Sequence, residues 1–250
     1  MRYFVQFSYL GSAYHGWQKQ PNALTVQEIM ESCFTTLLRK PIELVAAGRT
    51  DTGVHAHEMY AHFDIDKLDD DGTLVHRLNS FLPGDIAVSR LIAVTSDAHA
   101  RFSALQRTYK YTIVRRKDPF LIQTSHYSKL AYDFELMNEA AELLIGHKDF
   151  ECFSKSRTDV KTYMCDVSYA RWEQNEEQLV FTISADRFLR NMVRAVVGTL
   201  LDVGIGKKSL KDVKTIIKNK DRSLAGVSVP AKGLSLVRVQ YPEEMLHRNG

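Results

Sequence analysis

Long hydrophobic runs are missing from this sequence of 250 residues. No stretch approaches the roughly 18 uninterrupted apolar residues of a membrane-spanning helix, so we expect no membrane partner. The first residues, MRYFVQFSYLG, lack the apolar core and the small-residue cleavage site of a secretory signal peptide. The sequence therefore predicts a cytoplasmic protein.

Cysteine is also scarce. The sequence has three cysteines, Cys33, Cys152 and Cys165, and their odd number and wide spacing favour neither a disulfide framework nor a zinc knuckle. Cys33 falls on the apolar stripe of an expected helix, which is typical of a small core residue. No structural metal follows from these cysteines.

A large excess of charge is absent as well, because 33 basic and 30 acidic residues leave a net charge of +3. The basic residues are nevertheless clustered. Residues 98–117 contain six of them and no acid, 187–201 contain three and no acid, and 207–222 contain seven against two acids. The first run also contains Phe102, Tyr109 and Tyr111. Such runs favour a face that binds a polyanion, although the lysines of the third run suit a solvated surface equally well.

The hydrophobic pattern divides the chain into two similar halves. The first has the β-α-β-β-α-β order of a ferredoxin-like unit, with strands expected at 2–10, 42–47, 57–65 and 85–94 and helices capped by Thr25 and Thr73. The second repeats this order with one added helix, with strands at 108–114, 163–172, 179–185 and 234–239, a helix capped by Asp133, and helices at about 188–202 and 209–218.

The fold class is therefore α/β (α+β), with a mainly antiparallel sheet and helices packed on one side. We expect an N-terminal half at residues 1–101 and a C-terminal half at 102–250. No linker rich in proline, glycine or serine separates them, so we expect the sheets of the two halves to join.

The densest polar cluster is Gly48-Arg-Thr-Asp-Thr-Gly-Val-His55, between two expected strands. A loop on a strand scaffold that holds one carboxylate among basic groups is a common way to build a site. Arg49 and His55 would keep Asp51 ionised, because a neighbouring cation stabilises a carboxylate. The alternative is a tight Asx turn with a structural role and no catalytic one.

This cluster resembles the active-site motif of the TruA-type tRNA pseudouridine synthases. Further segments match the same family in order along the chain: Tyr9–Gln18, Leu82–Ala87, His99–Ala104, Arg107–Tyr111, Met192–Arg194 and Gly233-Leu234. The resemblance extends from residue 2 to about residue 240. It implies the pseudouridine synthase fold and an isomerase without a cofactor. Such an enzyme breaks the N1–C1′ bond of a uridine in tRNA, turns the base and rejoins it through C5.

The resemblance also assigns catalytic roles. Asp51 corresponds to the essential aspartate, which acts either as a nucleophile or as a base, and Arg194 corresponds to its ion-pair partner. Tyr109 corresponds to the tyrosine that stacks near the target uracil. These roles make physical sense, because a base must leave its helix to react, at a cost of a few kcal/mol. Stacking on an aromatic ring returns about 1–3 kcal/mol.

Four residues are expected to bind the substrate besides Tyr109. By resemblance, Arg49 occupies the space of the flipped base, and Leu234 lines the pocket. Arg101 and Arg107 lie in the first basic run and are expected to contact phosphates. The resemblance implies tRNA as the partner, with uridines at positions 38, 39 and 40 of the anticodon stem-loop as targets, and a homodimer.

Three other interpretations fit less well. A metal site built from His55, His57, His62 and Asp51 is disfavoured, because positions 55 and 57 share a strand face and 62 lies opposite. The segment 204–208, GIGKK, has lysine where a P-loop needs serine or threonine. A non-catalytic RNA-binding module remains the main alternative, although no RNP1-like run occurs.

Overall fold

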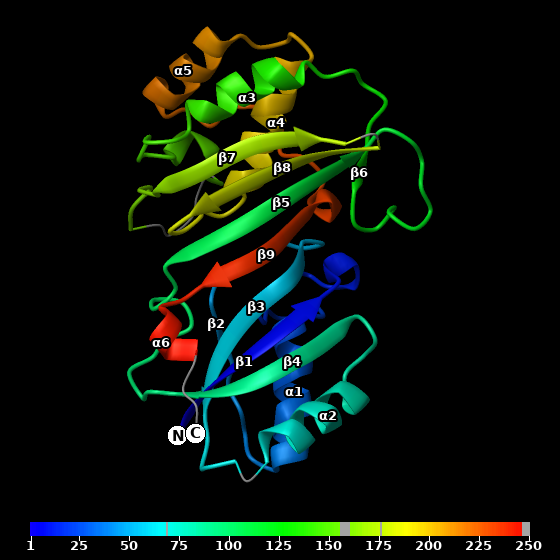
Figure 1. Cartoon of the computed structure of the whole chain (residues 1–250), viewed down its shortest axis with the longest axis vertical. Coiled ribbons are helices and arrows are strands. Elements are labelled where there is room, and N and C mark those ends of the chain that lie inside the picture. The colour runs from blue at the N-terminus through cyan, green and yellow to red at the C-terminus, as the bar shows by residue number, and fades with distance from the viewer. Residues whose placement is uncertain (69, 156–160, 176, 247–250) are drawn as a thin grey trace. The chain divides into compact units, whose positions relative to one another are not determined.

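The structure is a computed structural model that describes residues 1–68, 70–155, 161–175 and 177–246. Over these residues the fold is mixed α/β, with nine strands and six α-helices. The chain divides into two compact units (Figure 1). Unit 1 comprises Met1–Gln106 and Leu236–Gly250, and unit 2 comprises Arg107–Ser235.

Unit 1 follows the order of elements that the hydrophobic pattern predicts. Its elements are β1 (Arg2–Tyr9), α1 (Val26–Leu38), β2 (Val45–Ala46), β3 (His55–Asp64), α2 (Asp71–Phe81) and β4 (Ile86–Val94), joined at the end of the chain by β9 (Leu234–Gln240) and α6 (Glu243–Leu246). The strand order is β4-β1-β3-β9, with β2 paired to β3. Strand β1 runs antiparallel to both β3 and β4.

In its described residues, unit 2 contains three longer strands, one short strand and three α-helices. These are β5 (Gln106–Val114), β6 (His126–Tyr127), α3 (Phe134–Glu142), β7 (Val167–Gln174), β8 (Gln178–Ala185), α4 (Met192–Gly204) and α5 (Leu210–Asn219). Strand β8 lies between β5 and β7 and is antiparallel to both, while β6 is parallel to β5. Helix α4 passes behind β7 and β8 in the view of Figure 1.

The cysteines belong to the core. Cys33 lies on the buried face of α1, as expected, and Cys152 and Cys165 are buried in unit 2. Burial raises the pKa of the Cys33 thiol to about 11 and the pKa values of the other two to about 12. None of the three is therefore a reactive thiolate at neutral pH.

The expected starts of α2 and β7 are wrong for identifiable reasons. Helix α2 begins at Asp71 rather than near Thr73, because the Asp70 carboxylate caps it by accepting the Thr73 amide at 3.0 Å. Strand β7 begins at Val167 rather than at residue 163. Residues 163–165 instead pair with 148–150, through an isolated antiparallel bridge and two backbone hydrogen bonds.

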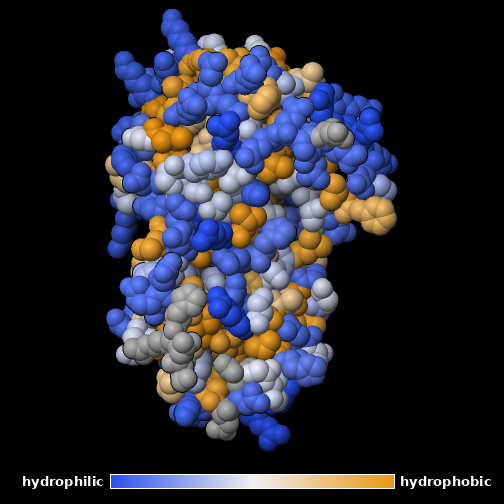
Figure 2. Space-filling view, in the orientation of Figure 1, coloured by the Kyte–Doolittle hydropathy of each residue, from blue (hydrophilic) through white to orange (hydrophobic). Residues whose placement is uncertain are grey.

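Hydrophilic residues cover most of the face shown in Figure 2, and hydrophobic residues lie between them in small groups.

None of the helices in the described ranges is both long enough and apolar enough to cross a bilayer.

A pair of histidines braces unit 1. The buried His62 on β3 accepts the Ala100 amide on Nδ1 at 3.2 Å, and its ring packs edge to face with the His99 ring, with centroids 4.5 Å apart. Burial, followed by the charge of Arg2 and the proximity of His99, lowers the pKa of His62 to about 4, while Asp64 acts in the opposite direction. Burial also lowers the pKa of His99.

This pair predicts a loss of stability in mild acid. Between about pH 6.5 and pH 4, the unfolded chain binds a proton at His62 that the folded protein does not. The contribution of the neutral His62 to the free energy of unfolding is therefore fully present above about pH 6.5. It falls as the pH drops, by up to about 1.4 kcal/mol per pH unit for one proton. Urea unfolding at pH 7 and pH 5 measures this fall. The His62→Asn variant keeps an acceptor but does not titrate, so its free energy of unfolding should depend less steeply on pH. If this pH dependence is the same as in the wild type, His62 is not its source.

Candidate active site

The candidate carboxylate lies in the loop of residues 48–54 that connects β2 to β3, here called the Asp51 loop. The backbone turns at Asp51, where the Val54 amide donates to the Asp51 carbonyl at 3.1 Å. Gly53 supplies the positive φ of 77° that such a turn requires at its third position. Asp51 is half-buried and Arg49 is exposed. The loop is thus a defined turn that leaves both side chains partly open.

The segment Tyr9–Gln18 holds the Asp51 loop through its backbone. The Trp17 amide donates to the Thr50 carbonyl at 3.3 Å, and the Gly53 amide donates to the Tyr14 carbonyl at 3.3 Å. Gly16 permits this approach, since a Cβ at that position would lie 2.4 Å from the Thr50 oxygen, and its φ is +86°. The residues on either side of the candidate carboxylate are therefore tied to a second backbone segment.

The segment Leu82–Ala87 supports the same arrangement. The Tyr14 hydroxyl donates to the Asp85 carboxylate at 2.5 Å, and the Leu10 amide donates to the Asp85 carbonyl at 2.9 Å. Three segments that match one family separately in sequence thus form one hydrogen-bonded assembly. Sequence reasoning did not assign Tyr14 and Asp85 a role. Their position inside the matched segments was the signal in the sequence that pointed to such a role.

His55 does not act as the cation that the sequence suggests. It is buried, and its Nδ1 accepts the Gly11 amide at 2.9 Å. A ring nitrogen that accepts a hydrogen bond carries no proton, so this imidazole is neutral in the structure. Over the described parts of the chain, no group of three or more histidine, cysteine, aspartate or glutamate side chains could hold a metal ion.

Tyr109 lies on β5 in unit 2, opposite Ile183 of β8. The Phe188 ring meets the half-buried Tyr109 ring edge to face, with centroids 5.2 Å apart and planes at 89°. This contact sets the plane of the Tyr109 ring, because aromatic pairs prefer such geometry. Phe188 thus supports Tyr109, a role that the sequence pattern alone did not reveal.

Arg194 lies in the first turn of α4, where its Nε donates to the Val229 carbonyl at 2.8 Å. The helix begins at Met192 rather than at 188, because Asn191 has a φ of +66° and cannot continue a helix. Gly198 packs against the segment 226–229 so closely that a Cβ would lie 1.9 Å from the Val227 oxygen. The position of Arg194 is thus set by this segment.

The same segment leads to Leu234, which is buried. Tyr111 is completely buried, and its hydroxyl donates to the Pro230 carbonyl at 3.1 Å. The expectation that Tyr111 interleaves with basic residues on a binding face is therefore wrong. Tyr111 shares a strand face with Tyr109, but it lies deeper in unit 2, so its ring fills the core.

The two expected phosphate ligands differ in their surroundings. Arg101 is exposed in unit 1. Arg107 is half-buried in unit 2, where its Nη1 donates to the Asp186 carbonyl at 2.7 Å. Of the expected site residues, unit 1 supplies Arg49, Asp51 and Arg101, and unit 2 supplies Arg107, Tyr109, Arg194 and Leu234.

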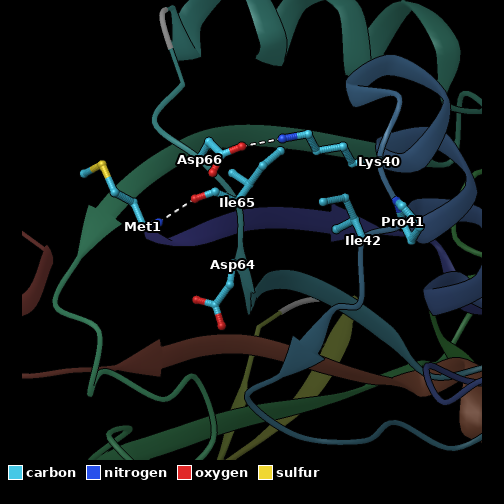
Figure 3. A pocket seen from close by; sticks show the side chains of 7 residues that line it. All are labelled: Met1, Lys40, Pro41, Ile42, Asp64, Ile65 and Asp66. Atoms are coloured by element: carbon cyan, nitrogen blue, oxygen red, sulfur yellow. Dashed lines mark hydrogen bonds and ion pairs between the residues drawn. The ribbon is translucent and has the colours of Figure 1, made fainter.

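A hollow of about 360 Å³ lies elsewhere in unit 1 (Figure 3). Its charged groups are already paired, since Lys40 bonds to Asp66 and Asp64 bonds to Arg2. The N-terminal ammonium of Met1 donates to the Ile65 carbonyl. None of the expected site residues lines this hollow, so it is not the candidate active site.

A mixed α/β fold with one carboxylate on a braced loop agrees with the pseudouridine synthase class. Residues 6–103 and 140–242 match the family model described as tRNA pseudouridine synthase. The tRNA pseudouridine synthase A of Porphyromonas gingivalis is 52% identical over 250 residues, with 98% of each chain covered. The protein of that name from Bacteroides fragilis is 51% identical over 98% of each chain, and the one from Colwellia psychrerythraea is 38% identical over 97% of this chain and 95% of its own. The chain belongs to the tRNA pseudouridine synthase A family.

The close approach at Gly16 predicts a selective loss of activity. A Cβ there must displace the Thr50 carbonyl and with it the Asp51 loop, and a shift of about 1 Å in a reacting group costs about 100-fold in rate. We expect Gly16→Ala to lower turnover of tRNA by about that factor. The matched control is Gly206→Ala, since Gly206 also has a positive φ (+73°) but a Cβ there meets nothing within 4 Å. Equal turnover and equal melting temperatures of the two variants would contradict the role of Gly16.

Proposed function

We propose that this protein isomerises uridines of tRNA to pseudouridine, and that its targets are the uridines at positions 38, 39 and 40 of the anticodon stem-loop. The observation that carries the proposal is the braced Asp51 loop, within a chain that matches the tRNA pseudouridine synthase A proteins along almost its whole length. The product is an isomer of the substrate, so the reaction needs no net electron or group transfer.

Asp51 is the reacting group in this proposal. The N1–C1′ bond of the uridine breaks, the uracil turns, and a C5–C1′ bond forms; C5 then loses its proton and N1 gains one. Asp51 acts on the sugar either as a nucleophile or as a base. Arg194 serves as its ion-pair partner and keeps the carboxylate charged, because a nearby cation favours the ionised form.

The target base must leave its stack before it reacts. Tyr109 then provides a ring for the uracil to stack on, and the edge-to-face contact with Phe188 supports this role by holding the ring in one orientation. Leu234 lines the pocket for the base. Arg49 enters the space that the base has left and binds the RNA backbone, and its exposure supports that role.

Arg101, Arg107 and the exposed side chains of Arg115, Arg116 and Lys117 form the proposed path for the RNA backbone. Cations on such a path bind phosphates and release condensed counterions, which makes affinity depend on salt. Arg107 also holds β5 to the end of β8, so it contributes to the fold of unit 2.

The finer architecture belongs to the same proposal. Each half is a ferredoxin-like unit with helices packed on one side of its strands, and the order β4-β1-β3 in unit 1, with β2 also paired to β3, supports this. The half at residues 1–101 carries the catalytic loop, and the half at 102–250 completes the active site and the RNA cleft. The enzyme acts as a homodimer, as the family resemblance implies, and it works in the cytoplasm.

The Asp51 carboxylate can be tested directly. We expect Asp51→Asn to abolish turnover, because an amide is neither a nucleophile nor a base here, and to leave tRNA affinity within a few-fold. The assay is conversion of uridine to pseudouridine in an unmodified tRNA transcript, with the modified positions mapped in the product. A variant that keeps more than a tenth of wild-type turnover would overturn the role of Asp51. A wild-type protein that binds tRNA without converting it would favour the non-catalytic RNA-binding module.

The basic tip after β5 predicts a change in salt dependence. Replacing Arg115, Arg116 and Lys117 by alanine together should flatten the slope of log affinity against log salt, by up to about three phosphates at roughly 0.7–0.9 each. Turnover at saturating tRNA should change little. The matched control exchanges charge for charge, with Arg115→Lys, Arg116→Lys and Lys117→Arg, and should keep the wild-type slope. If the alanine variant also keeps that slope, these side chains do not contact the RNA.

A further inference from the structure

The loop of residues 98–105 in unit 1, here called the Phe102 loop, exposes a large aromatic ring. Phe102 is 75% exposed, and the nearby Leu105 is 55% exposed. Phenylalanine is among the residues most often buried, and Phe102 differs from other exposed side chains because its backbone is held by His99 and a guanidinium lies beside its ring. Neither residue has a part in the chemistry proposed above.

The backbone of the Phe102 loop is held by histidine. The amides of Arg101 and Phe102 both donate to Nδ1 of His99, at 3.1 and 3.4 Å. The His99 amide donates to the Ser103 hydroxyl at 3.0 Å, and the Ser103 amide returns a bond to the His99 carbonyl at 2.9 Å. One imidazole thus fixes the backbone of both Arg101 and Phe102, two residues with exposed side chains.

The rest of unit 1 anchors the same loop. His62 of β3 accepts the Ala100 amide, and the Tyr241 hydroxyl donates to the Ala100 carbonyl at 2.5 Å. Ala100 is completely buried, as is nearly all of Ala98. The exposed ring therefore extends from a rigid base rather than from a loose loop.

An imidazole and a guanidinium lie beside the Phe102 ring. The His99 ring packs against it with centroids 4.3 Å apart and planes at 39°, and the Arg101 guanidinium carbon lies 5.6 Å from its centroid. No acidic residue occurs between residues 98 and 117. An aromatic ring with a guanidinium beside it, in a segment free of acids, suits a ligand that has a flat base and a phosphate.

We propose that the Phe102 loop is a docking element for an unpaired nucleotide of the RNA, in which Phe102 stacks on the base, Arg101 contacts the neighbouring phosphate and His99 positions both. This inference rests on the proposed function, since it takes tRNA as the ligand. Every base has a π-face, so such a platform holds RNA without reading its sequence. Because the loop is already ordered, little conformational entropy is lost on binding.

The first experiment changes the ring. Phe102→Leu removes the aromatic face but keeps an apolar side chain, and we expect it to weaken binding of an unmodified tRNA transcript about 5-fold or more, the range for stacking on one base. Turnover at saturating tRNA should stay within two-fold of wild type. The matched control is Phe81→Leu, which changes an exposed phenylalanine at the end of α2 and should leave affinity unchanged.

A fluorescent variant reports stacking itself. Phe102→Trp keeps an aromatic face, and both native tryptophans, Trp17 and Trp172, are buried. We expect the emission of the new tryptophan to be quenched when tRNA is added, with affinity close to wild type. A Phe81→Trp variant should show no such quenching.

The positioning role of His99 is tested by a double-mutant cycle. His99→Leu removes the acceptor for the two amides and should weaken tRNA binding about as much as Phe102→Leu. The double variant should bind no more weakly than either single variant, because both changes disable one element. His99→Asn retains an acceptor and should recover most of the affinity. A purely structural role would instead lower the melting temperature and give additive losses in affinity.

The outcomes separate this inference from the proposed function. If wild-type protein converts uridine but Phe102→Leu binds tRNA normally and Phe102→Trp is not quenched, the docking element is refuted and the enzyme assignment stands. If wild type converts no uridine, the proposed function itself fails. If Phe102→Leu changes the oligomeric state in sedimentation while tRNA affinity is unchanged, the ring contacts a second copy of the chain, and the proposal is overturned.

Discussion

The position of Asp51 depends on a close contact between two stretches of backbone. The segment that contains Gly16 approaches the Thr50 carbonyl so closely that no side chain fits between them. The same segment continues into α1, where the Gln27 amide donates to the Trp17 carbonyl at 3.1 Å and Trp17 is buried. The loop therefore takes its rigidity from the core of unit 1, although it contains no regular secondary structure.

Unit 2 uses the same principle for its own charged residue. Helix α4 packs at Gly198 against the segment 226–229, and Arg194 binds the carbonyl of Val229 in that segment. A contact between backbone atoms orders no long side chain, so it costs no side-chain rotamer entropy. In both units, backbone packing thus determines the position of a residue with a proposed catalytic role, Asp51 in unit 1 and Arg194 in unit 2. Such preorganisation is what electrostatic and proton-transfer catalysis requires.

Histidines have a structural role in this protein. His55, His62 and His99 each accept backbone amides on Nδ1, and each thereby holds a loop near a strand. A neutral imidazole suits this role, because it presents an acceptor at low desolvation cost. The sequence pattern favoured His55 as a cation beside Asp51, and residue type alone could not show otherwise. The accepted hydrogen bond is visible only once the segment containing Gly11 folds back onto β3.

From the sequence alone, the order of the main strands and helices, the burial of Cys33 and the family were predictable, because periodic hydrophobicity and long motifs are local features of the chain. The position of Asp51 at a strand-to-strand turn was predictable for the same reason. The tertiary structure alone decided that Tyr14 and Asp85 brace this loop, that Phe188 supports Tyr109, and that Tyr111 is core. It also shifted the starts of α2, β7 and α4, where a side-chain cap, a backbone bridge and a left-handed residue overrode the hydrophobic period. These features depend on contacts between residues far apart in the chain, and such contacts leave no periodic signal in the sequence.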